Sequence, residues 1–131
     1  SVLKQINRLK STFIVKKSSL YETKPLGPQG QPNFINAVIE IKTNFDPHEL
    51  LSELQELERQ HNRKKTKKWG PRSIDLDILI YNKIIMDSKD LIIPHPGLEY
   101  REFVLIPLYE ITGYGYEIPK YGRVSNLIKN L

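Results

Sequence analysis

The sequence predicts an α+β domain with a largely antiparallel sheet. Residues 34–43 and 74–81 alternate their apolar side chains with the period of a β-strand. Between them, residues 47–61 carry Leu at spacings that place an apolar stripe on one face of a helix. Strands and helices do not follow the regular order that builds a parallel sheet, so we expect an antiparallel one. The length of 131 residues fits a single domain, residues 1–131.

The first part of the chain predicts a helix, a strand, a stiff loop and a second strand. Apolar residues at positions 2, 3, 6 and 9 fall on one helical face. Residues 12–23 are rich in β-branched and aromatic side chains, which favours a strand. Residues 24–32 contain enough Pro and Gly to exclude both a helix and a central strand. The strand at 34–43 follows this loop.

The helix at 47–61 has a start signal in the sequence. Asp46 is expected to be its N-cap, Pro47 its first residue and Glu49 the partner in a capping box.

The second half of the chain predicts a hairpin followed by helices. In chain order we expect a strand at 74–81, a turn at 82–83, a strand at 84–93, partly helical structure at 99–111 and a short helix at 124–131. Pro107 is expected to start a new turn rather than to lie inside a helix, because it has no N–H to donate.

Positive charge is concentrated in one strip of the chain, residues 59–72. Seven of the 20 Lys and Arg residues lie there with no acid among them, which leaves 13 cations against 15 acids elsewhere. A general nucleic-acid binder usually spreads its cations over a broad face. The compact strip suits a small polyphosphate better.

The composition also bears on location. Absence of Cys from the sequence excludes disulfides, a thiolate metal site and a Cys nucleophile, and we expect a reducing compartment, the cytoplasm. No apolar run approaches the roughly 18 residues of a membrane span. Met86 is the only Met in the sequence, so we expect further residues ahead of Ser1.

Asp75 and Asp77 are the strongest candidates for chemistry. In a strand, the apolar residues around them would face the core, and the two acids would share the opposite face about 7 Å apart. Two carboxylates so placed favour a hard cation such as Mg²⁺ between them. The alternative is a solvated strand face with two ordinary acids. The cationic strip directly before them favours the metal site.

The end of the cationic strip, Trp69-Gly70-Pro71-Arg72, has a restricted backbone. Gly and Pro would aim Arg72 beside the acids, where a guanidinium can clamp a phosphate with two hydrogen bonds. Two alternatives stay open. The strip can be an ordinary solvated segment, and Trp69 can be an ordinary core residue.

Residues 69–79, with the sequence WGPRSIDLDIL, resemble the signature of the 6-hydroxymethyl-7,8-dihydropterin pyrophosphokinases, enzymes of folate biosynthesis. Further segments agree with this family in order and spacing, namely residues 21–36, 58–63, 93–96 and 101–108. The resemblance covers nearly the whole chain. It implies a ferredoxin-like α+β fold and the ATP-dependent transfer of pyrophosphate to the pterin's hydroxymethyl group, with release of AMP.

The resemblance also implies roles in binding metal and ATP. Asp75 and Asp77 would each help to hold two Mg²⁺ ions, and with Arg63 and Arg72 they would be the catalytic residues. The expected ATP-binding residues are Glu58, Arg63, Lys65, Lys68, Arg72, Ile78, His95 and Arg101. Either Asp77 or a metal-bound water would serve as the base that accepts the proton of the attacking hydroxyl.

For the pterin, the resemblance implies a slot with two stacking rings and one amide. Phe34 and Phe103 match the stacking pair, and Asn36 matches the amide that reads the pterin edge. The expected pterin-binding residues are Thr23, Pro25, Leu26, Phe34, Asn36, Trp69 and Phe103. Core packing is the alternative for the two Phe residues, whereas an amide in the core would need a partner.

The family opens with a strand and a Gly-Ser-Asn turn, which this sequence lacks. We therefore expect the sequence to be N-terminally incomplete and its sheet to miss that strand. Two other functions stay open: a small nucleic-acid-binding domain that uses residues 59–72, and an inactive remnant that serves as an interaction module. The expected partners are ATP and the pterin, without nucleic acid or membrane. Fusion to or association with another folate-pathway enzyme is a further expectation.

Overall fold

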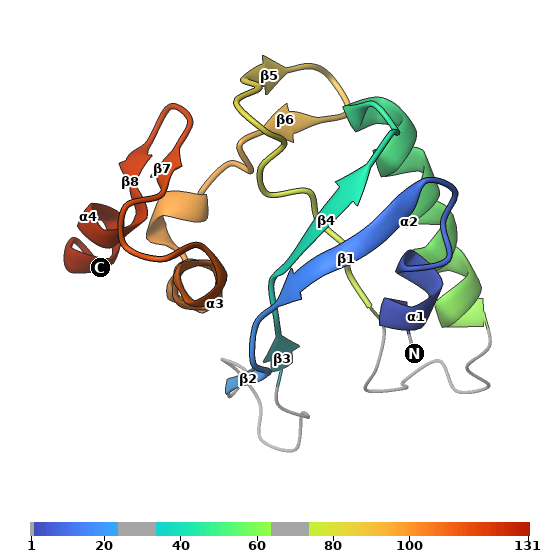
Figure 1. Cartoon of the computed structure of the whole chain (residues 1–131), viewed down its shortest axis with the longest axis horizontal. Coiled ribbons are helices and arrows are strands. Elements are labelled where there is room, and N and C mark those ends of the chain that lie inside the picture. Colours follow the sequence, from blue (N-terminus) through green and yellow to red (C-terminus); the bar gives the residue numbers. More distant parts are fainter. Residues whose placement is uncertain (1, 24–33, 64–73) are drawn as a thin grey trace. The chain divides into compact units, whose positions relative to one another are not determined.

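The computed structural model describes residues 2–23, 34–63 and 74–131 (Figure 1). Its elements in chain order are α1 (Val2–Ile6), β1 (Thr12–Lys17), β2 (Tyr21–Thr23), β3 (Phe34–Asn36), β4 (Ile39–Thr43), α2 (Pro47–Arg63), β5 (Met86–Asp87), β6 (Ile92–Ile93), the 3₁₀ turn η1 (Leu98–Tyr100), α3 (Glu102–Thr112), β7 (Glu117–Ile118), β8 (Gly122–Arg123) and α4 (Val124–Lys129).

The α+β class predicted from the sequence is confirmed. Strand β1 pairs with β4, and the pairs β2–β3, β5–β6 and β7–β8 are antiparallel. The ferredoxin-like arrangement and the organisation as a single domain stay predictions. Among the described residues, no helix combines the length and the apolar character that crossing a membrane requires.

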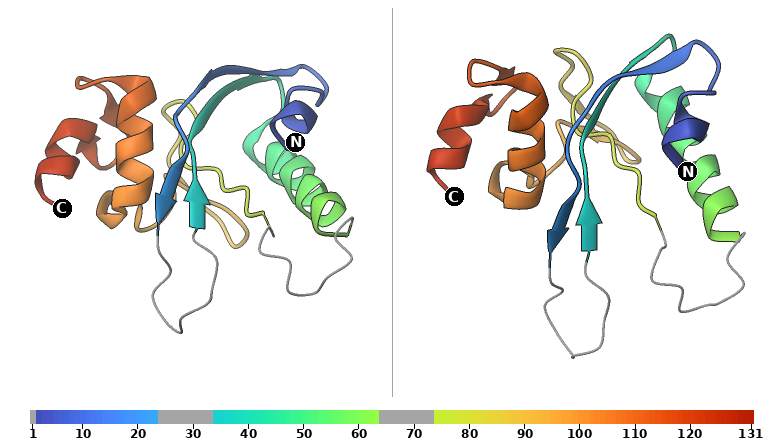
Figure 2. Two further views of the ribbon diagram at one scale, coloured as in Figure 1. Left: turned by 90° about the horizontal axis from the view of Figure 1, so that it is seen from below. Right: turned by 60° about the horizontal axis from the view of Figure 1, so that its bottom comes forward.

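The chain forms two compact units. The first contains the described residues within 1–15 and 41–77, and the second those within 16–40 and 78–131. In the first unit α1 packs against α2, and both views in Figure 2 show these blue and green helices side by side. Ile6 of α1 is buried, as are Leu50, Leu54 and Leu57 of α2. The predicted Leu stripe is therefore confirmed, and its burial stabilises the helix.

The start of α2 is the capping box that the sequence predicts. The backbone N–H of Glu49 donates to Asp46 Oδ1 at 2.8 Å, and the N–H of Asp46 donates to Glu49 Oε1 at 2.9 Å. The two side chains thus satisfy each other's backbone donors at the helix N-terminus. Helix α1 is shorter than expected. It ends at Ile6, and the next side chain, that of Asn7, accepts the N–H of Ile14 at 2.9 Å.

The two expected strands at 12–23 and 34–43 are each interrupted. Ser18 separates β1 from β2, and its backbone N–H donates to the carbonyl of Val38 at 2.9 Å. The Ser18 hydroxyl oxygen in turn accepts the N–H of Val38, also at 2.9 Å. This exchange replaces regular pairing at the point where β3 gives way to β4. The prediction of continuous strands was wrong here because a side chain enters the ladder.

The core of the second unit lies around α3 and α4. Its buried residues are Val38, Leu98, Leu105, Leu108, Ile118 and Val124. The prediction for Pro107 was wrong, because α3 continues through this residue from Glu102 to Thr112. Pro107 is fully buried beside two of these core residues, so apolar burial offsets the backbone hydrogen bond that it cannot make.

The expected hairpin of strands 74–81 and 84–93 was also wrong. Residues 74–80 are assigned to no strand, and residues 84–93 fold back on themselves as the pair β5–β6. Between those strands, the Ser88 hydroxyl donates to the carbonyl of Leu91 and accepts its N–H. This local turn brings Met86 opposite Ile93, so the partner of β5 comes from its own segment.

Candidate functional site

The two predicted metal ligands lie on the exposed side of residues 74–78. Asp75 and Asp77 are exposed, Ile74 and Leu76 are half-buried, and Ile78 is buried. The alternation predicted from the sequence is thus confirmed as a burial pattern, although the segment is not a paired strand. Neither acid has a hydrogen bond or ion pair to another described residue. Toward the described part of the chain, both therefore present unpaired carboxylate oxygens, and such oxygens are the ligands that Mg²⁺ prefers.

Among the described residues, Asp75 and Asp77 are the two side chains that we expect to bind a metal ion. Within 2–23, 34–63 and 74–131, no three His, Cys, Asp or Glu side chains are grouped so that they could hold a metal ion. Mg²⁺ commonly takes one or two carboxylates and completes its shell with substrate phosphates and water. The acidic pair fits that pattern.

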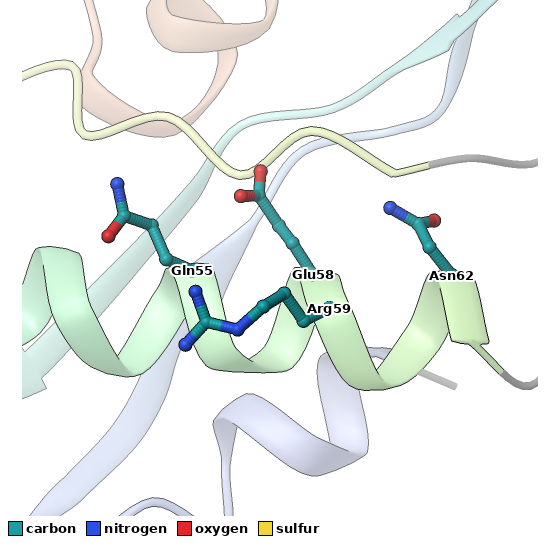
Figure 3. Close-up of a pocket in the computed structure, with 4 residues that line it drawn as sticks. All are labelled: Gln55, Glu58, Arg59 and Asn62. Carbon is teal, nitrogen blue, oxygen red and sulfur yellow. The ribbon is translucent and has the colours of Figure 1, made fainter.

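Helix α2 holds the acidic segment by two hydrogen bonds. The N–H of Leu76 donates to Glu58 Oε2 at 2.6 Å, and the N–H of Ile74 donates to Asn62 Oδ1 at 3.3 Å. Figure 3 shows Glu58 and Asn62 rising from the same side of α2 toward this segment. Glu58 was expected to bind ATP, and that role stays a prediction. Asn62 was not expected at all, because its partner is a backbone group that the sequence does not reveal.

An open hollow of about 700 Å³ lies along this side of α2, lined by Gln55, Glu58, Arg59 and Asn62 (Figure 3). The Arg59 guanidinium is paired with Glu56 one turn earlier at 2.9 Å. The lining therefore consists of two carboxamides, one carboxylate and one cation that is already paired, which favours hydrogen bonding over apolar contact.

The predicted pterin residues that the structure describes come from β2, β3 and the start of α3 in the second unit. Asn36 is exposed at the end of β3, opposite Tyr21 in the strand register. Phe103 lies in the first turn of α3 and is 46% exposed. Core packing was the alternative for Phe103, and this exposure excludes it. The backbones of Thr23 and Phe34 face each other across the same strand pair.

His95 is half-buried, and its ring orientation is fixed by its neighbour. Nδ1 lies 2.9 Å from the carbonyl oxygen of Pro96. Because a carbonyl only accepts hydrogen bonds, Nδ1 carries the proton. The contact of His95 with ATP stays a prediction.

For the remaining predicted site residues that it describes, the structure gives the position in the fold or the exposure but no contact that bears on their role. Arg101 is exposed and is the N-cap residue of α3, and Ile78 is buried at 8% exposure. Arg63 ends α2. Six predicted residues lie outside the described part of the chain: Pro25, Leu26, Lys65, Lys68, Trp69 and Arg72.

Glu110 of α3 accepts hydrogen bonds from Ser19 and Tyr21 that the sequence does not suggest. Its carboxylate accepts the Tyr21 hydroxyl at 2.6 Å, the Ser19 hydroxyl at 2.8 Å and the Ser19 N–H at 3.0 Å. These bonds, led by the one from Tyr21, lower the pKa of Glu110 below 4.5. Glu110 therefore ties the start of β2, where a predicted pterin-binding segment begins, to α3.

The stability contributed by Glu110 should depend on pH. Because its pKa is lowered in the folded state, the contribution is complete above the ordinary value of 4.5 and is lost as pH falls through the folded value. We expect Glu110→Gln to lower the melting temperature at pH 7 and to lower it progressively less toward pH 3. Thermal melts across this range test the expectation, with Asp90→Asn, at an exposed bend, as the control. A Glu110→Gln difference that does not change with pH would contradict it.

Comparison with known proteins gives the same answer as the signature at 69–79. A family model described as 7,8-dihydro-6-hydroxymethylpterin-pyrophosphokinase matches residues 1–113. The 2-amino-4-hydroxy-6-hydroxymethyldihydropteridine pyrophosphokinase of Haemophilus influenzae is 43% identical over 129 residues, which are 98% of this chain and 80% of that protein. The protein of the same name from Bacillus subtilis is 46% identical over 98 residues, 75% of this chain and 59% of that protein. The mitochondrial folate synthesis bifunctional protein of Arabidopsis thaliana is 47% identical over 100 residues, 76% of this chain and 18% of that protein.

These matches define an enzyme class, the kinases that transfer a pyrophosphoryl group. The chain belongs to the 7,8-dihydro-6-hydroxymethylpterin-pyrophosphokinase family. The resemblance predicted from the sequence is thereby confirmed.

Proposed function

We propose that this chain transfers the pyrophosphoryl group of ATP to the hydroxymethyl group of 6-hydroxymethyl-7,8-dihydropterin. The observation that carries the proposal is the pair Asp75 and Asp77, exposed on one side of a segment whose backbone is bonded to α2. Family membership supplies the substrates, since the relatives are named as pyrophosphokinases of this pterin.

The reaction is a displacement at phosphorus. The pterin hydroxyl oxygen bonds to the β-phosphorus, the bond from that phosphorus to the oxygen bridging the α-phosphate breaks, and AMP leaves with the bridging oxygen. The hydroxyl proton passes to a base, for which Asp77 is the candidate on this chain. The protein's task is to align the two substrates and to offset the phosphate charge.

Asp75 and Asp77 would hold a pair of Mg²⁺ ions. When bound, Mg²⁺ would neutralise charge on the phosphate oxygens. The cationic residues assigned by resemblance, Arg63 and Arg72 with Lys65 or Lys68, would contact the same phosphates. Arg101, exposed at the start of α3, and His95 would add contacts to the phosphates.

A direct assay tests the proposal. The chain is mixed with ATP, Mg²⁺ and the pterin alcohol, and the nucleotide product is identified by chromatography. We expect AMP in equal amount to the pterin diphosphate, and no turnover when the pterin or the metal is left out. Formation of ADP, or of AMP without the pterin, would contradict the proposal.

The pterin slot can be tested separately through Asn36. Asn36→Ala should weaken pterin binding by about 1–3 kcal/mol, because hydrogen bonds to the pterin edge are lost. The affinity for ATP should stay unchanged. Titration calorimetry with each ligand measures both, with the neighbouring Ile35→Ala, 64% exposed on the same strand, as the control. An equal loss for both ligands would show that Asn36 is not a pterin contact.

An association with another enzyme of folate synthesis stays a prediction. The name of the Arabidopsis relative, a bifunctional protein of which this chain matches 18%, supports it.

A further inference from the structure

Two side chains of α2 take the place that a neighbouring strand would occupy beside the acidic segment. Glu58 and Asn62 are four residues apart in the helix, and they accept the N–H groups of Leu76 and Ile74, which are two residues apart in the extended chain. In extended backbone, alternate N–H groups point to the same edge. The helix side chains therefore satisfy one edge of this segment without a β-ladder.

The distance between the two acceptors along the helix is close to the distance between the two donors along the extended chain. Four residues of α-helix rise about 6 Å. Two residues of extended chain advance about 6.6 Å. Acceptors at 58 and 62 can thus bond donors at 76 and 74 in reverse order with little distortion. A shift of the segment by one residue without rotation would break this match at both bonds, because adjacent N–H groups of extended chain point to opposite edges.

The orientation that these bonds fix decides which side of the segment Asp75 and Asp77 occupy. Side chains of extended chain alternate between two sides, so rotating the segment by half a turn would break both bonds, turn Asp75 and Asp77 inward and bring Leu76 to the exposed side. We propose that Asn62, together with Glu58, is a positioning residue that fixes the register and rotation of residues 74–77 and so aims both acids at the same substrate. This inference rests on the proposed function for its catalytic consequence and on the two hydrogen bonds for its structural one.

Hydrogen exchange in the metal-free protein tests the structural part. Asn62→Ala removes the acceptor of Ile74, so we expect the Ile74 amide to exchange about two- to tenfold faster, as loss of one modest hydrogen bond allows. Asn62→Asp keeps an acceptor oxygen and should retain most of the protection. Gln60→Ala is the matched control, because Gln60 is exposed on the same turn and its side chain bonds Glu56 within α2 rather than the segment at 74–77. Unchanged exchange at Ile74 in Asn62→Ala would overturn the inference.

Steady-state kinetics test the catalytic part. We expect Asn62→Ala to lower kcat about two- to tenfold with little change in the KM for the pterin, and Asn62→Asp to recover part of the loss. Equal kcat values for wild type and Asn62→Ala would overturn the positioning role. If the wild type itself does not form AMP from ATP and the pterin, the proposed function fails, and the exchange experiment still decides whether Asn62 holds the segment.

Discussion

Replacing Asp75 or Asp77 by Ala is expected to lower turnover by about two orders of magnitude or more. Each substitution removes a ligand that would hold metal against the phosphates, and loss of such charge stabilisation is costly in the transition state. The free protein should keep its stability or gain slightly, because like charges on one exposed side repel each other. Binding of the pterin without ATP should be largely unaffected.

The measurement is the AMP assay alongside thermal melts of each variant. Asp90→Ala serves as the control, since Asp90 is exposed in the bend between β5 and β6. If Asp75→Ala and Asp77→Ala both turn over at the wild-type rate, the metal-site assignment fails and the proposed mechanism fails with it.

The second large effect is expected in the core. Leu105 is fully buried in α3 among the residues that unite α3, α4 and β7. Leu105→Ala should destabilise the protein by about 2–5 kcal/mol, from lost apolar burial and the cavity left behind. Urea unfolding measures the change, with Leu20→Ala, 72% exposed, as a control expected within about 0.5 kcal/mol of wild type. A small effect at Leu105 would mean that this core is not a cooperative part of the fold.

The sequence predicts best what depends on neighbours along the chain. The capping box of Asp46 and Glu49 and the Leu stripe of α2 are confirmed, because helix starts and helix faces are set within a few residues. The burial alternation around Asp75 and Asp77 is confirmed for the same reason.

Two of the errors involve a partner distant in sequence or an unusual compensation. Nothing near Ser18 shows that it bonds Val38, and α3 passes through Pro107 only because burial offsets a missing bond. The candidate site also combines residues that can be predicted and residues that cannot. Asp75 and Asp77 stand out in the sequence, whereas the roles of Glu110 and Asn62 depend on partners that only the folded chain brings near.

The bonds from α2 to residues 74 and 76 also have a consequence for loop-closure entropy. They join positions 12 and 18 residues apart, Asn62 to Ile74 and Glu58 to Leu76, on either side of most of the cationic strip. The entropic cost of closing a loop grows only with the logarithm of its length, so doubling the length costs about 0.6 kcal/mol. An insertion between residues 63 and 74 should therefore cost little free energy of folding. Asp75 and Asp77 can then keep their place when the strip becomes longer.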